Sequence, residues 1–399
     1  MKHRIRSLAL ALMACGATSS HADDKSFKLS GFGTLAATHS TEKHADFVSR
    51  NVPNGPGHSR EWDTLMDSKL GLQGDIRFND QLSVAVQAIA FKRYDNGFYP
   101  DITAAHVRYE AYPGLAVRVG RMAMPIYLVS DYRRAGYALP WFSPPVEFYG
   151  NGFFHYDGAD LTWKTPLGEW ALTTQAYTGH SKFRNPDRGF FSANQIFGAA
   201  VTGEKGDHTL RASITNAKMK VTSAIDPLLA AYRAAGTPAS VAVADNYAVN
   251  DLSNTFVSLG YMYAPGDWLV MAELGKTHTE REALLAEQTL GYITIGYRLG
   301  SVTPYVTLAR RDTSTANNVQ GVVPSLDATL NSAIAAGDVS QTRTSLGARW
   351  DFMTNMALKT QFDHVNLDSD SAGGLVNRQP GFTRGGSYNL LSVAVDFVF

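Results

Sequence analysis

Apolar and polar residues alternate with a period of two along most of this chain. The pattern is clearest at the C-terminus, where Leu391, Val393, Val395, Phe397 and Phe399 form one apolar row with small or polar residues between them. Successive side chains of a β-strand point to opposite faces, so such a row marks a strand between an apolar and a polar environment. In a transmembrane barrel these two environments are the lipid and a polar lumen.

The same alternation predicts sixteen strands, most of them close to the ~9–11 residues that cross a bilayer as a tilted strand. They lie at 27–38, 69–78, 82–91, 104–111, 115–120, 158–164, 170–177, 195–201, 209–216, 255–263, 268–276, 289–299, 303–310, 343–352, 356–364 and 389–399. An even number of strands is typical of bacterial single-chain barrels. The expected fold class is therefore all-β, a 16-stranded antiparallel transmembrane β-barrel that forms a single domain over residues 23–399.

The connections alternate between short turns and long segments, as in barrels with short periplasmic turns and long outer loops. The turns are 79–80, 113–114, 166–168, 265–267, 300–301 and 354–355, and the long segments are 41–66, 92–101, 121–157, 180–192, 217–252, 312–340 and 365–386. Two loops contain helix signals. One helix begins with Asp226 as N-cap and Pro227 in its first turn and stops at Gly236; the other covers 325–336 and ends at Gly337.

The first 22 residues have the composition of an export signal. Lys2, Arg4 and Arg6 precede a short apolar core, and Ser20-His21-Ala22 offers a cleavage site, which predicts a mature start at Asp23. Cys15, the only cysteine, then leaves with the signal; the alternative is a lipoprotein site that anchors Cys15 by lipid. Removing the three basic residues leaves 33 Lys and Arg against 36 Asp and Glu, which excludes the strongly basic surface of a nucleic-acid-binding protein.

Charged residues on the inward register are candidates for the lining of the lumen, because such charges set which ions enter a pore. The basic set is Lys28, Lys69, Arg77, Arg108, Arg118, Lys164, Arg211, Arg298, Arg343, Arg349 and Lys359. The acidic set is Asp75, Glu110, Asp160, Glu273, Asp351, Asp363 and Asp396. The basic excess predicts a mild preference for anions. The alternative is that many of these charges pair across neighbouring strands.

The segment 121–157 is richer in aromatic residues and proline than a mobile surface loop, which indicates an ordered loop. Placed inside the barrel, it would narrow the pore. The candidate constriction residues are Arg118, Arg121, Asp131, Arg133, Arg134 and Glu147. The alternative is an outer loop that packs against its neighbours or at a subunit contact.

Several short segments resemble the Gram-negative trimeric porins over nearly the whole mature chain. They are Leu29-Ser30-Gly31-Phe32-Gly33, Ser68-Lys69-Leu70-Gly71-Leu72-Gln73-Gly74, Val119-Gly120-Arg121, Pro145-Val146-Glu147-Phe148-Tyr149-Gly150 and the terminal Phe399. The resemblance implies a homotrimer in the outer membrane, among its lipids, and a third outer loop folded into the barrel with Glu147 and Asp131 facing Arg121 and Arg118. It also implies delivery to the barrel-assembly machinery through Phe399. The long third loop is closer to the dicarboxylate- and anion-specific (DcaP-like) branch than to the commonest general porins.

Some barrels are hydrolases, which need a nucleophile or activated water beside a base. The chain has no Gly-x-Ser-x-Gly motif and no paired Cys/His metal spacing. His278 with Glu280 and Glu282 is better explained as a charged loop, and His155 with Asp157 as a polar lining, since sixteen strands leave an aqueous channel rather than a filled barrel. We therefore expect no enzyme, no cofactor and no metal site, but a passive channel for small hydrophilic solutes such as small carboxylates. The open alternatives are an adhesin whose loops 217–252 and 312–340 bind partners, and a barrel hydrolase.

Overall fold

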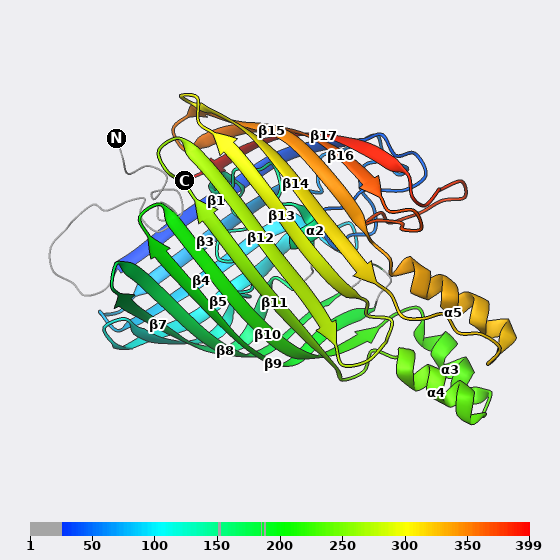
Figure 1. Ribbon diagram of the computed structural model, residues 1–399. Coiled ribbons are helices and arrows are strands. Elements are labelled where there is room, and N and C mark those ends of the chain that lie inside the picture. The colour runs from blue at the N-terminus through cyan, green and yellow to red at the C-terminus, as the bar shows by residue number, and fades with distance from the viewer. Residues whose placement is uncertain (1–25, 151–152, 185, 187–188) are drawn as a thin grey trace.

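The computed structural model describes residues 26–150, 153–184, 186 and 189–399, so the expected signal segment lies outside the described residues. A closed antiparallel barrel of sixteen long strands forms the molecule (Figure 1). The strands are β1 (Ser26–Ser40), β3 (Lys69–Arg77), β4 (Leu82–Lys92), β5 (Phe98–Tyr112), β6 (Leu115–Ala123), β7 (His155–Leu167), β8 (Trp170–Arg184), β9 (Phe190–Lys205), β10 (His208–Thr222), β11 (Leu252–Tyr263), β12 (Trp268–Thr279), β13 (Glu287–Tyr297), β14 (Val302–Ser314), β15 (Gln341–Met353), β16 (Met356–Leu367) and β17 (Ser387–Val398). Because β1 pairs with both β17 and β3, the sheet has no free edge.

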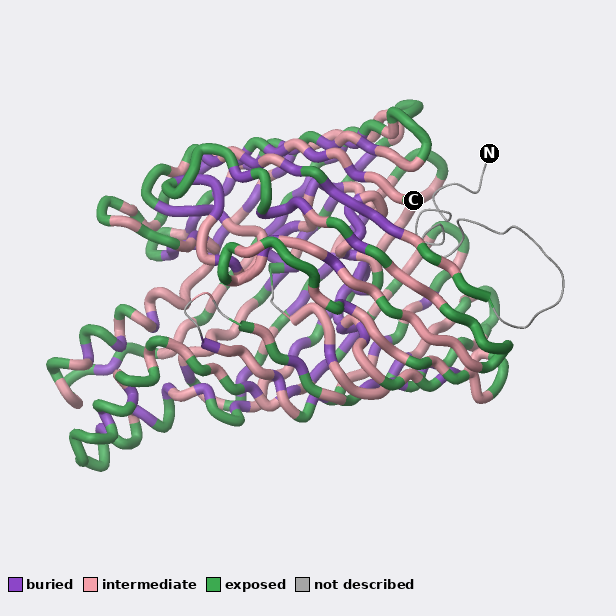
Figure 2. The backbone as a smooth tube through the Cα atoms, turned by 180° about the vertical axis from the view of Figure 1, so that it is seen from behind, coloured by how far each residue is buried: buried purple, intermediate pink, exposed green. Residues whose placement is uncertain are grey.

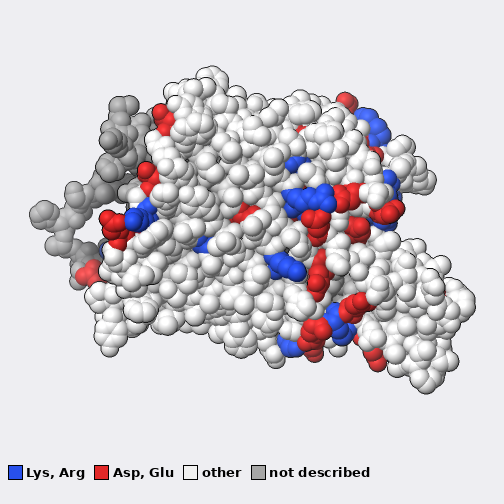
Figure 3. Space-filling model, viewed as in Figure 1, with Lys and Arg blue, Asp and Glu red and all other residues white. Residues whose placement is uncertain are grey.

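The outer wall carries the apolar row of each strand. Large apolar side chains that point outward remain exposed, for example Leu35 at 67% and Trp163 at 53%. The inward partners on the same strands are mostly buried or half-buried, as the alternation of colours along the strands shows (Figure 2). In Figure 3 charged side chains gather toward the two ends of the face in view and are sparse over its middle. An apolar band between polar rims is what a barrel presents to a bilayer.

All sixteen predicted strands are present, but several are longer than the alternation indicates. β5 begins at Phe98, β8 runs to Arg184 and β9 begins at Phe190, so these strands extend into the expected loops 92–101 and 180–192. Alternation fades at the outer ends because both strand faces meet polar surroundings there. Pro166, expected in a turn, lies within β7, and a two-residue strand, β2 (Trp62–Asp63), that pairs with β1 was not predicted.

Both predicted helices are confirmed. They are α3 (Asp226–Ala234) and α5 (Pro324–Ala336), and a third helix, α4 (Pro238–Tyr247), was not predicted although Thr237 and Ser240 form a capping box at its start. Asp226 is the first helical residue rather than the N-cap, a position taken by Ile225. The three helices pack through a separate apolar cluster and extend from the outer end of the barrel (Figure 1). None of the helices in the described part of the chain has the length and apolar character to cross a membrane.

Candidate functional site

The connection between β6 and β7 lies inside the barrel. It contains a 3₁₀ turn, η1 (Gly136–Ala138), and one helical turn, α2 (Val146–Tyr149), which Figure 1 shows within the ring of strands. Backbone groups of this loop bind inward-pointing side chains of the opposite wall: the Leu128 N–H donates to Glu273 over 2.7 Å. In the middle of the loop, Lys359 Nζ donates to the Gly136 carbonyl over 2.6 Å. The expectation of an internal loop agrees with this geometry.

The loop approaches the wall closely at Gly136. A Cβ built on this residue would overlap the carboxylate of Asp396 and come within 2.6 Å of Thr34 Oγ1. Asp396 is fully buried and forms a 2.8 Å ion pair with Lys359, which holds the Gly136 carbonyl. A side chain at position 136 would therefore push the loop away from β1 and β17.

Glu147 fixes the far end of the loop, on α2. Its carboxylate is fully buried, 3.0 Å from Nε of Arg343, and also accepts a hydrogen bond from Gln341. Arg311 donates to the backbone carbonyls of Val146 and Glu147. The expectation that Glu147 faces Arg121 and Arg118 across an eyelet is wrong, because Glu147 meets β15 on another side of the barrel.

Aromatic side chains fill the space between loop and wall. Trp141 packs edge-on against Tyr292 at 5.6 Å and donates its indole N–H to Thr294 over 2.8 Å. Tyr149 and Tyr292 both donate to the buried carboxylate of Glu273. The aromatic richness of the segment thus reflects a packed interface with the barrel wall.

Several predicted lumen charges hold the loop rather than line open water. Arg349 donates to the carbonyls of Tyr137 and Leu139, and Arg211 donates to the carbonyl of Pro125 over 2.9 Å. Lys359 and Glu273 act in the same way, as described above. Of the remaining predicted positions, Arg108 pairs with Glu110 at 2.7 Å, whereas Arg77 and Lys164 are exposed near strand ends and Lys69 lines a cavity.

The two predicted basic eyelet residues on β6 have different surroundings. Arg118 points inward, is bound bidentately by Asp160, and has the exposed Asp131 within electrostatic range. Arg121 lies near the end of β6 on the register of the exposed Val117 and Val119, pairs with Asp157 at 2.7 Å, and also reaches the lining of the basic cavity described below. A shift of one residue in the register of a strand moves every side chain to the opposite face. The sequence around Gly120 does not show to which face Arg121 points.

A basic cavity of about 670 Å³ lies between the loop and the wall of β3–β9. Its lining contains nine Lys and Arg residues and two Asp residues. The basic residues are Arg50, Lys69, Lys92, Arg93, Arg121, Arg133, Arg134, Lys182 and Arg184, and the acidic ones are Asp67 and Asp101. Among the described residues, Lys69, Arg133, Arg134, Lys182 and Arg184 have no carboxylate at ion-pair distance. Among the described lining residues, basic side chains therefore outnumber acidic ones by nine to two.

Arg133 and Arg134 project from the loop into this cavity and stack on aromatic rings. The Arg133 guanidinium lies 4.1 Å from the ring centre of Phe154 and 4.9 Å from that of Tyr127. The Arg134 guanidinium lies 4.4 Å from the ring of Phe154 and 4.9 Å from that of Phe91. Stacking fixes the guanidinium planes but leaves their N–H edges able to bind an anion.

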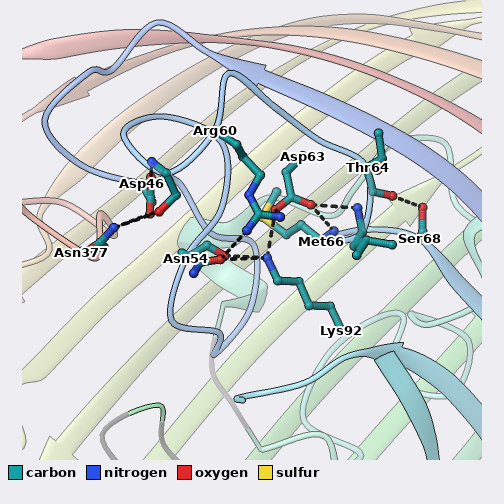
Figure 4. A network of polar contacts seen from close by, with 11 residues as sticks. Asp46, Asn54, Arg60, Asp63, Thr64, Met66, Ser68, Lys92 and Asn377 are labelled. Atoms are coloured by element: carbon teal, nitrogen blue, oxygen red, sulfur yellow. Dashed lines mark hydrogen bonds and ion pairs between the residues drawn. The ribbon is translucent and has the colours of Figure 1, made fainter. Parts of the chain in front are cut away.

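The first outer loop supplies cavity residues that the sequence did not reveal. Arg50 stands over Phe91 at 5.4 Å and 3.6 Å from Asp67. The loop is held by the network in Figure 4, in which Asp63 binds Lys92 at 2.9 Å and receives the backbone N–H of Met66. Lys92 is thereby neutralised, whereas Arg50 reaches the solute path. No periodicity marks a loop residue as inward, so Arg50 could not be found from the sequence pattern.

The residues considered for catalysis do not form a hydrolytic site. His278 pairs with Glu287 at 2.7 Å, Glu280 with Lys218 at 3.4 Å, and Asp157 with Arg121. His155 Nδ1 is buried without a hydrogen-bond partner in the described residues. Throughout those same residues, no group of three or more His, Cys, Asp or Glu side chains could hold a metal ion.

A closed 16-stranded barrel with a lipid-facing apolar wall and a loop folded into its lumen defines a membrane channel of the porin class. The family model described as Gram-negative porin matches residues 8–317, and the chain belongs to this family. It is thus an outer-membrane protein through which solutes diffuse passively. No curated protein matches the chain.

Solved structures agree with this fold at low sequence identity. The anion-selective porin from Comamonas acidovorans is 13% identical with a TM-score of 0.57, over 94% of this chain and 100% of that one. The outer membrane channel DcaP of Acinetobacter baumannii is 11% identical with a TM-score of 0.59, over 94% of this chain and 97% of that one. In vitro folded OmpT of Vibrio cholerae, in its trimer form, is 10% identical with a TM-score of 0.51, over 94% and 100%.

Proposed function

We propose that this barrel is an anion-preferring diffusion pore, with the basic cavity as its selective region. The observation that carries the proposal is the composition of the cavity wall, nine basic residues against two acidic ones. A narrow passage with one sign of charge raises the local concentration of counter-ions and lowers that of co-ions. The similarity in fold to the anion-selective porin of Comamonas acidovorans is consistent with this proposal.

In this proposal the third loop narrows the pore and sets its charge. Its anchors, Glu147 and Gly136, hold it against β15 and β16, and Arg133 and Arg134 line the basic cavity. Asp131, opposite Arg118, is the one exposed loop carboxylate of the predicted constriction set. Small carboxylates are the solutes that such a passage favours, because arginine binds carboxylate through paired N–H groups.

The reversal potential of the channel in a KCl gradient tests ion selectivity directly. We expect the wild-type protein to favour chloride and the double variant Arg133→Gln, Arg134→Gln to lose most of that preference. Arg77→Gln is the matched control, because it removes one charge at an exposed strand end. Cation selectivity of the wild-type channel, or equal selectivity of all three proteins, would refute the proposal.

Further features of the protein are part of the same proposal. A homotrimer is supported by the trimer form of the similar Vibrio cholerae OmpT, and native mass measurement in detergent tests it. We propose cleavage after Ala22, which N-terminal sequencing of the exported protein tests, and recognition of Phe399 by the assembly machinery. We also propose that the protein has no enzymatic activity, which the match to the Gram-negative porin family supports.

A further inference from the structure

A second cavity of about 350 Å³ adjoins the basic one, and its chemistry is different. Apolar side chains dominate its wall, among them Met219, Phe256, Phe191, Leu285 and Ile196. Arg50 and Arg311 are the charged residues of that wall. A water-filled passage for hydrophilic ions gains nothing from such a wall, because water beside apolar side chains lacks hydrogen-bond partners there.

The two cavities meet at a common wall. Ser49, Arg50, Asn51, Val146 and Phe183 line both of them. Phe183 stacks on Phe191 with ring centres 5.1 Å apart and meets Phe153 edge-on at 4.9 Å. A solute could therefore contact the aromatic group around Phe183 and the cations of the first cavity at the same time.

The basic cavity contains an unsatisfied buried donor. Arg133 is 8% exposed, and its Nη2 has no hydrogen-bond partner among the described residues. Arg134 and Arg50 both stand over the Phe91 ring, at 4.9 and 5.4 Å. A buried guanidinium N–H without a partner is costly, and a carboxylate is the group that best satisfies it.

We propose that the two cavities together form one transient binding site for small aromatic carboxylates. The carboxylate would bind the guanidinium edges of Arg133, Arg134 and Arg50, and the ring would lie against Phe183 in the apolar cavity. An inorganic anion or acetate would satisfy the cations but leave the apolar wall wet. The inference rests on the proposed anion-preferring pore and adds the class of solute to it.

Block of the chloride current by added anions tests this site in planar bilayers with the full protein. The probes are phenylacetate, acetate and succinate, and the readout is the concentration that halves the current. Burial of a phenyl ring predicts that phenylacetate blocks at a concentration roughly tenfold to a hundredfold lower than acetate does. Succinate separates the effect of a ring from that of a second charge.

Two kinds of variant separate the cationic half of the site from the apolar half. Arg134→Gln should weaken block by both phenylacetate and acetate. Phe183→Ala, and independently Leu285→Asn, should reduce the advantage of phenylacetate at least threefold and leave acetate block unchanged. Phe197→Ala is the matched control, since Phe197 is 62% exposed on the outer wall. Only variants that fold are compared. A folded barrel is recognised by an electrophoretic mobility that changes when the sample is heated.

The outcomes distinguish this site from the pore itself. Equal block by the three anions, or preferential block by succinate, would overturn the aromatic site while the anion preference stands. A channel that favours cations and is blocked by none of the probes would overturn the site and the proposed function together. A phenylacetate advantage that Phe183→Ala and Leu285→Asn both leave intact would also overturn the assigned location.

Discussion

The anchor at Glu147 allows a quantitative test of how the third loop is held. Its buried carboxylate has one close cation, Arg343, which is 4% exposed, and a second hydrogen bond from Gln341. Glu147→Ala removes both contacts and leaves Arg343 with only Asp363, at 3.6 Å. Removal of one partner of a buried ion pair costs about 3–5 kcal/mol. Because Arg343 keeps a distant partner, we take the lower value, about 3 kcal/mol.

This cost falls on the position of the loop rather than on the barrel, whose strand pairing does not involve Glu147. A change of about 3 kcal/mol shifts the balance between docked and released loop by roughly 150-fold. Hydrogen–deuterium exchange of peptides covering 141–150 should quicken by a similar factor up to the unprotected limit. Single-channel recordings should show a larger and noisier current.

Two further variants serve as controls for Glu147→Ala. Glu147→Gln keeps an acceptor for Gln341 and should show a smaller effect. Asp312→Asn breaks an ion pair whose two side chains are about half exposed, which is worth only about 0–1 kcal/mol, and should leave the loop unchanged. If Glu147→Ala shows the exchange rate and conductance of the wild type, the carboxylate does not hold the loop and the anchoring role of α2 is wrong.

Three further predictions concern other parts of the molecule. Gly136→Ala should displace η1 from Asp396 and raise the conductance, with normal strand exchange; an unchanged current would contradict the close approach. Hydrogen bonds from Tyr232 and the Val323 N–H lower the pKa of Asp327 below its ordinary value of 3.8, so this carboxylate stabilises the outer helices above that value and the stabilisation is lost as the pH falls through the lowered pKa. The protection of α5 amides relative to their intrinsic exchange rate should therefore fall at acid pH in the wild type but not in Asp327→Asn. Replacing 224–249 with a short Gly/Ser linker should leave selectivity unchanged, because the helices pack in their own cluster; lost selectivity would assign them to the pore.

The strand architecture was predictable because lipid and lumen impose a two-residue period on every strand between them. Leu391 to Phe399 shows the pattern in full, and all sixteen segments appear in the barrel. The period is lost at the outer ends of β5, β8 and β9, where no lipid requires one apolar face. β2 lacks a pattern altogether, since two residues have no period.

The inward register of most charges was also predictable, but their roles were not. Periodicity places Arg349, Lys359 and Glu273 on the inner face, and in the structure all three are buried on that face. It cannot say whether an inward charge meets water, another strand or a loop. Each of these three binds the backbone of the third loop, a contact that spans more than 140 residues of sequence. Arg121 is a case in which the family motif was misleading. Its partner, Asp157, lies opposite it in the register of β6 and β7, and the motif around Arg121 does not indicate this pairing.

The same contacts explain why, among the described residues, the basic ones without a carboxylate partner lie on one side of the lumen. Charges of β12 to β17, such as Glu273, Arg343 and Lys359, are buried by the loop and satisfied by it, so they present little field to a passing ion. A buried, paired charge must stay paired because its exposure alone would be costly. The loop in turn directs Arg133 and Arg134 toward β3–β9, where few carboxylates are present to balance their charge. The ratio of basic to acidic residues counted over all strands therefore understates the basic character of the passage, because loop docking removes balanced charges from the wall and adds unbalanced ones.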